Sequence, residues 1–125
     1  MKLSDYVAQK AVENGVKHVF MVTGGGAMHL NHSFGTHKDL ECIFNHHEQA
    51  CAIGAEAYYR QSNRLPIVNV TSGPGGTNTI TGVYGAWVDS IAMLVISGQV
   101  KWETTVRSTG LSLRQYGDQE LDIEE

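Results

Sequence analysis

One glutamate stands out in this sequence as a group that could exchange a proton with a ligand. Glu48 follows two adjacent histidines and precedes the small, mostly apolar run of residues 50–55. A carboxyl group in an apolar setting is driven towards a protonated or proton-sharing state, which suits acid–base chemistry. The simpler interpretation is structural: Asn45 caps a helix and Glu48 completes a capping box three residues later. Taken alone, the residue types favour the cap.

Two glycine-rich segments offer backbone to a ligand. The first is Gly24-Gly25-Gly26, and the second is Ser72-Gly73-Pro74-Gly75-Gly76-Thr77-Asn78. Position 29 is His29, so the dinucleotide fingerprint is incomplete, and the second segment lacks the Lys-Ser/Thr ending of a phosphate-binding P-loop. Either both segments approach a flat ligand closely, or both are tight turns, with Thr77 or Asn78 available to cap the following helix.

The histidines and cysteines do not indicate a metal site. His46 and His47 are neighbours and should point to different sides, and the two cysteines, Cys42 and Cys51, are not paired in sequence. We therefore predict no protein-built metal site and place a loop histidine near a ligand instead. Cys42 and Cys51 are expected to be buried free thiols in a reducing cytoplasm.

Short apolar strands alternate with helices along the chain. We predict an N-terminal helix capped by Ser4 and ended by Gly15, further helices at 27–33, 48–61 and 77–88, and strands at 18–22, 41–45, 67–71 and 91–97. This alternation predicts an α/β fold, an open parallel sheet flanked by helices on both faces. The glycine run, His46-His47-Glu48 and residues 72–76 each follow a strand, and ligands of such folds bind at the carboxyl ends of strands.

Composition narrows the function classes. The chain has 125 residues, a formal charge of -4 and a pI near 5.8, which predicts one domain without the basic surface that nucleic acid or anionic lipid requires. The longest apolar run, 91–96, falls well short of the ~20 residues that span a bilayer, and no signal peptide is apparent. The pattern weakens after Gly98, so we expect residues 1–125 to be a single domain truncated at its C-terminus.

The first three turns of the helix predicted at 48–61 have little polar surface, and residues 82–86 of the helix predicted at 77–88 are similarly small and apolar. A helix that is apolar nearly all round is normally covered on two sides, and the sheet covers only one. A second subunit, another domain or a tightly folded monomer would each account for this.

Together these segments resemble a known family. The matching stretches, in order, are Val19-Phe20, Gly24-Gly25-Gly26-Ala27, His47-Glu48-Gln49-Ala50, residues 71–78, Asp89-Ser90, Ser97-Gly98-Gln99-Val100 and Gln119-Glu120-Leu121-Asp122-Ile123. In this they resemble the N-terminal, pyrimidine-binding domain of acetolactate synthase-like thiamine-diphosphate enzymes. The sequence departs from the family pattern at Thr23, where a proline is usual, and at Asp118, where an aromatic residue is common.

The resemblance implies a role for each group. Glu48 would hydrogen-bond the aminopyrimidine ring and drive it to the imino tautomer that removes the proton from the thiazolium carbon. The expected cofactor-binding residues are Gly24, Gly25, Gly26, Glu48, Ser72, Gly73, Pro74, Gly75 and Asn78, and the expected substrate-cleft residues are His47, Gln99 and Gln119.

The resemblance also implies partners. The substrate would be a 2-oxo acid, and the complete lyase or transferase would be a homodimer or homotetramer. Magnesium and the diphosphate would be held by a domain of a partner subunit, so the isolated chain is expected to be inactive. The flavin FAD is compatible with the resemblance but is not indicated by the sequence. The alternative is a non-catalytic α/β module that binds a nucleotide or serves assembly.

Overall fold

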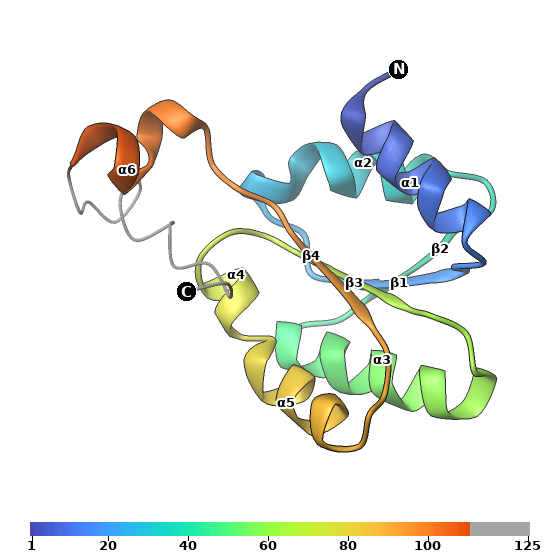
Figure 1. Cartoon of the computed structure of the whole chain (residues 1–125). Coiled ribbons are helices and arrows are strands. Elements are labelled where there is room, and N and C mark those ends of the chain that lie inside the picture. Colours follow the sequence, from blue (N-terminus) through green and yellow to red (C-terminus); the bar gives the residue numbers. More distant parts are fainter. Residues whose placement is uncertain (111–125) are drawn as a thin grey trace.

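Four parallel strands form one sheet in the order β2-β1-β3-β4 (Figure 1). The computed structural model describes residues 1–110, apart from the side chain of Val106. The strands are β1 (His18–Met21), β2 (Glu41–Phe44), β3 (Ile67–Val70) and β4 (Leu94–Ser97). Every residue of β3 is buried, as expected for an apolar strand in the middle of a parallel sheet. The predicted α/β fold is confirmed.

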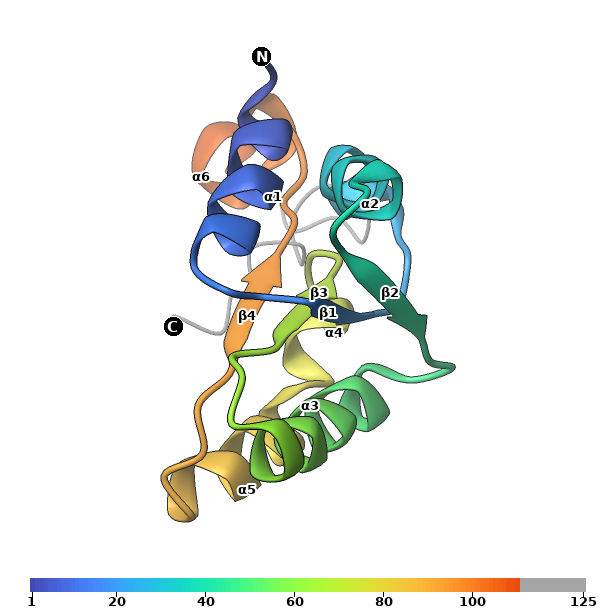
Figure 2. The ribbon, with the colours of Figure 1, turned by 90° about the vertical axis from the view of Figure 1, so that its right-hand side faces the viewer.

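Helices cover both faces of the sheet. The longer helices are α1 (Leu3–Glu13), α2 (Met28–Thr36), α3 (Glu48–Ser62) and α5 (Ile80–Val88), and the shorter segments are η1 (Gly25–Ala27), α4 (Pro74–Thr77), η2 (Trp102–Thr104) and α6 (Val106–Thr109). Helices α1 and α2 lie on one face and α3 on the other, with α5 packed against α3 (Figures 1 and 2). Within residues 1–110, no helix is long and apolar enough to cross a membrane.

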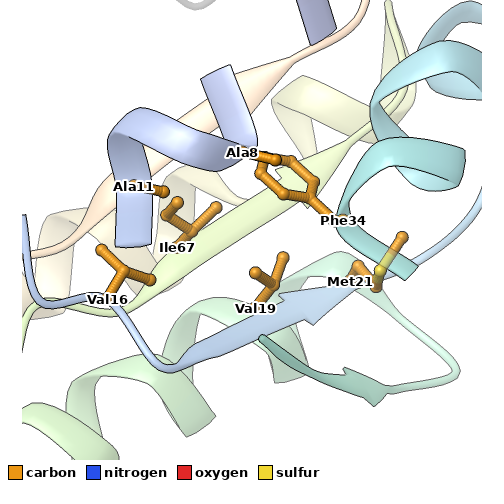
Figure 3. Packing of buried hydrophobic residues seen from close by; sticks show 7 residues of the cluster. All are labelled: Ala8, Ala11, Val16, Val19, Met21, Phe34 and Ile67. Carbon is orange, nitrogen blue, oxygen red and sulfur yellow. The ribbon is translucent and has the colours of Figure 1, made fainter. Parts of the chain in front are cut away.

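The core has two parts, one on each face of the sheet. On the α1/α2 face the buried cluster is Ala8, Ala11, Val16, Val19, Met21, Phe34 and Ile67 (Figure 3). On the α3 face it is Phe20, Cys51, Ala55, Val68 and Val70. Burial of this apolar surface supplies the main stabilisation of the fold.

The first helix begins differently from the prediction. Lys2 is the N-cap of α1, and Ser4 lies inside the helix, where its buried hydroxyl forms a hydrogen bond of 2.8 Å with Ser33 Oγ. The prediction that Ser4 is the cap was wrong because this hydroxyl joins α1 to α2 instead. Gly15 follows the helix with φ +84°, a conformation that glycine adopts without strain, which confirms it as the C-terminal stop.

The predicted helix at 77–88 is two helices. Pro74 starts α4 because proline suits the first turn of a helix. A new helix, α5, begins at Ile80 after Thr79, whose buried hydroxyl donates to the Gly76 carbonyl at 2.6 Å. Strand β4 begins at Leu94 rather than residue 91, because a turn with Ser90 at φ 56° follows α5. Segments η2 and α6 had no counterpart in the prediction.

Candidate functional site

The loops that follow β1, β3 and β4 meet at the carboxyl edge of the sheet, and Thr71 is their common contact. The backbone N–H of Gly26 donates to Thr71 Oγ1 at 3.0 Å. A Cβ added at Gly24 would lie 2.5 Å from Thr71 Cβ, and one at Gly75 would lie 2.7 Å from Thr71 Cγ2. These distances are too short for a side chain, so both glycines are required for the two turns to close around Thr71. Thr71 was not among the predicted site residues. The feature that could have identified it is a hydroxyl between a buried strand and a glycine-rich turn.

The loop after β4 also packs against the first glycine turn, here through backbone atoms. A Cβ at Gly98 would lie 2.3 Å from the carbonyl oxygen of Gly26. Gly98 is buried, and only a glycine permits this approach. The three loops are therefore fixed to one another before any ligand arrives.

The side-chain amides of Asn69 and Asn31 also support the first glycine turn. Asn69 is fully buried in β3, and its Nδ2 donates to Asn31 Oδ1 at 2.7 Å. Asn31 in turn donates to the Gly24 carbonyl at 3.3 Å. A side-chain amide inside an otherwise apolar strand was the signal for this support, and the sequence analysis overlooked it.

Glu48 is the first residue of α3 and is half-buried. The N-cap is His47, whose Nδ1 accepts from the Gln49 N–H at 3.1 Å. The capping box with Asn45 was therefore a wrong interpretation. Asn45 donates its backbone N–H to Met21 at 3.1 Å and so extends the β1–β2 pairing, and α3 starts three residues later. Because His47 supplies the cap, the Glu48 carboxylate is left for other contacts.

The two oxygens of Glu48 have different surroundings. Asn78 Nδ2 donates to Oε2 at 3.1 Å. Oε1 lies towards Gly75, where an added Cβ would be 3.8 Å away. Asn78 is the C-cap of α4, and Thr79 is the N-cap of α5, so the prediction that Thr77 or Asn78 caps the following helix was wrong.

The buried thiol of Cys51 lies one helical turn beyond Glu48. Burial raises the pKa of this thiol to about 11, and the nearby Glu48 carboxylate adds to the effect. A thiol with such a pKa is neutral near pH 7 and is a poor nucleophile. Both Cys51 and Cys42 are free, but Cys42 is only partly buried, which corrects the expectation that both are buried.

The remaining predicted residues are spread around this edge. His47 is exposed and caps α3. Ser72, Gly73 and Gly75 are buried in the second turn, and Pro74 and Gly25 are exposed.

Gln99 is exposed and lines a groove of about 520 Å³ with Gly26 and His29, on the α1/α2 side. The groove does not include Glu48, so the structure places Gln99 and Glu48 in separate surroundings. Gln119 lies outside the described residues.

Within residues 1–110, no three histidine, cysteine, aspartate or glutamate side chains gather in a way that could hold a metal ion. The groups that meet at this edge are the Glu48 carboxylate, the Asn78 amide and the backbone of the two glycine turns.

Comparison with known proteins identifies the family of the chain. Residues 1–125 match the family described as "Thiamine pyrophosphate enzyme, N-terminal TPP binding domain". The chain is 40% identical over 97 residues to the acetolactate synthase large subunit of Buchnera aphidicola (subsp. Acyrthosiphon pisum), which is 78% of this chain and 17% of that protein. The Escherichia coli acetolactate synthase isozyme 3 large subunit is 37% identical over the same length, with the same coverage. Arabidopsis thaliana chloroplastic acetolactate synthase is 33% identical over 99 residues, 79% of this chain and 15% of that protein.

The chain thus spans about a sixth of the length of the relatives that it matches. The family match covers every residue, and the three relatives are all named acetolactate synthases. This chain belongs to the thiamine pyrophosphate enzymes, as an N-terminal TPP-binding domain.

Proposed function

We propose that this chain binds the aminopyrimidine ring of thiamine diphosphate and that Glu48 exchanges a proton with a ring nitrogen. The observation that carries the proposal is the placement of Glu48. It begins a helix at the carboxyl edge of the sheet, beside a glycine turn, with one oxygen held by Asn78 and the other directed to Gly75.

The residues at this edge fit a flat ring. Gly75 has no side chain to cover Oε1 of Glu48, and a Cβ added at Gly25 would meet nothing within 4 Å. The turns are also rigid, because Thr71 and the Asn31–Asn69 pair hold them. A preorganised carboxylate needs little rearrangement to meet a ring nitrogen, which favours proton exchange.

Thiamine diphosphate, when bound, supplies an electron sink for breaking and forming carbon–carbon bonds. Glu48 would hydrogen-bond the pyrimidine, and Gly24–Gly26 and Ser72–Gly75 would line it with backbone groups. We further propose that the substrate is a 2-oxo acid and the overall reaction is decarboxylation with carboligation, because the relatives are named acetolactate synthases. Gln99 and Gln119 stay proposals for the substrate side.

We assign Mg²⁺ and the diphosphate to a region beyond this chain. No metal-binding cluster lies within residues 1–110, and the relatives are about six times longer than the matched segment. The chain alone is then expected to be inactive and to hold the cofactor only through its pyrimidine.

Thiamine titration tests the proposal on the chain itself. NMR of the 15N-labelled chain should show weak binding of thiamine, with signals moving at Glu48 and Gly75. Thiamine diphosphate with Mg²⁺ should bind no more than a few-fold better, because its charged half has no partner here. Glu48→Gln should reduce the response about tenfold or more, the size expected when a charged hydrogen-bond partner is lost.

Glu56→Gln is the matched control, since Glu56 lies on the same helix but pairs with Arg60 at 2.6 Å. Its thiamine response should equal that of the wild type. An unchanged response in Glu48→Gln would remove Glu48 from the proposal, and micromolar binding of thiamine diphosphate with Mg²⁺ would show that the diphosphate site lies on this chain.

The outer side of α5 is the surface that we assign to a second copy of the chain. It exposes Tyr84, Trp87 and Val88 to 67%, 79% and 62%. Ile53 of α3 and Ile80 at the start of α5 extend the same apolar surface towards Asn78 and Glu48. Exposed apolar groups that lie together mark interaction surfaces more often than isolated ones do. A partner seated there would also shield the Glu48 edge from water.

Trp87→Glu should abolish this association. Sedimentation equilibrium of the wild-type chain should give an apparent mass that rises with concentration, whereas the variant should stay monomeric. Trp102→Glu is the control, because Trp102 is 62% exposed but lies in η2, away from this surface. Equal behaviour of the two variants would show that α5 is not the interface.

A further inference from the structure

We infer that Asn78 is a positioning residue for Glu48, one that orients the carboxyl group without itself contacting the cofactor. This inference rests on the proposed function and goes beyond it, because the resemblance placed Asn78 among the cofactor-binding residues. It starts from the 3.1 Å hydrogen bond between Asn78 Nδ2 and Glu48 Oε2.

The direction of this hydrogen bond determines what each oxygen can do. The amide Nδ2 is only a donor, so Oε2 must be an acceptor. A proton on the Glu48 carboxyl would therefore reside on Oε1, the oxygen that lies towards Gly75. Asn78 thus selects which oxygen meets the ring nitrogen and keeps the exchangeable proton on that side.

The local backbone holds Asn78 in place for this contact. Its N–H donates to the Pro74 carbonyl at 3.0 Å, and the next residue, Thr79, is fully buried with its hydroxyl bonded to Gly76. Gly82 packs α5 against Ala52 of α3, the helix that carries Glu48. The donor and the acceptor therefore come from two elements whose separation is set by tight packing, which is the support that a positioned acid requires.

The first experiment examines the contact without any ligand. The side-chain amide signals of Asn78 in the 15N-labelled chain should move clearly in Glu48→Ala and stay in place in Thr81→Ala, an exposed position on α5. If Glu48→Ala leaves these signals unchanged, the hydrogen bond does not exist in solution and the inference is overturned.

The second experiment asks whether the contact acts through Glu48. The probe is thiamine, and the readout is the initial slope of the NMR shift against its concentration. Asn78→Ala should lower this slope about tenfold, and so should Asn78→Asp, which keeps the shape but loses the N–H donor. The double variant Glu48→Ala/Asn78→Ala should respond like Glu48→Ala alone, because residues that act as one unit are not additive.

The outcomes separate the two proposals. A wild-type slope in Asn78→Asp, or additive losses in the double variant, would overturn the positioning role. A wild-type slope in Glu48→Ala would instead overturn the proposed function, and it would do so whatever Asn78 does.

Discussion

On one face of the sheet, α1 and α2 are joined by polar groups above a core of large side chains. Ser33 of α2 donates to Asp5 of α1 at 2.7 Å, and Phe34 is fully buried beneath them. On the other face, α3 meets the sheet with Cys51, Ala52 and Ala55, and α5 lies directly on α3. The first arrangement joins helices through directed hydrogen bonds, and the second through close contact of small residues.

The difference matters because only the second arrangement carries the candidate acid. Small residues bring the backbones of α3 and α5 together, which places Asn78 within hydrogen-bond reach of Glu48. The outer side of α5 exposes Tyr84, Trp87 and Val88. The face that carries Glu48 is thus also the face on which we propose that a second copy binds.

Gly82→Ala should have the largest effect of the variants proposed for comparing the two faces. The added Cβ would lie 2.5 Å from Ala52 Cβ and 3.3 Å from the backbone N of Ile53, so the helices must separate. We expect a loss of about 1–3 kcal/mol in the free energy of unfolding, measured by urea denaturation, as for other overpacked cores. The Asn78 side-chain amide signal should move as well, because Asn78 lies two residues before α5 and a shift of α5 would change its distance from Glu48.

Gly35→Ala is its matched control on the other face. A Cβ at Gly35 of α2 would meet nothing within 4 Å, so this change should raise stability by about 0.5–1 kcal/mol through the helix propensity of alanine. Equal effects at the two glycines would show that close packing does not distinguish the two faces.

The arrangement of the elements was predictable because it depends on local pattern. Buried strands such as Ile67–Val70 are apolar apart from one residue, Asn69, and Gly15 and Gly24–Gly26 follow a helix and a strand where the chain turns. Parallel strands separated by helices leave few topologies, so the position of Glu48 at the carboxyl edge followed from chain order.

The partners of the site residues were not predictable in the same way. The contact between Asn78 and Glu48 spans thirty positions of sequence. The N-cap predictions were wrong for a related reason. Ser4 and Asn78 are residue types that cap helix N-termini, but the Ser4 hydroxyl bonds Ser33 and the Asn78 amide bonds Glu48, both distant in sequence. Thr71 was not predicted because its role depends on three glycines from two loops. It leaves no room for a side chain at Gly24, Gly26 or Gly75, and a propensity scale for single residues carries no information on such contacts.

The smallest predicted effect concerns Cys51 and appears only at alkaline pH. Its folded-state pKa of about 11 exceeds the ordinary thiol value of 9.0, chiefly because of burial. Between these two pH values the unfolded chain loses the thiol proton while the folded chain keeps it, so stability must fall as pH rises. Urea denaturation at several pH values should show this decline in the wild type and a shallower one in Cys51→Ala. The comparison uses the slopes, since the variant also loses packing against Phe20 and Val68. Identical slopes would mean that water reaches the thiol, and that the small-residue face between α3 and the sheet is not dry.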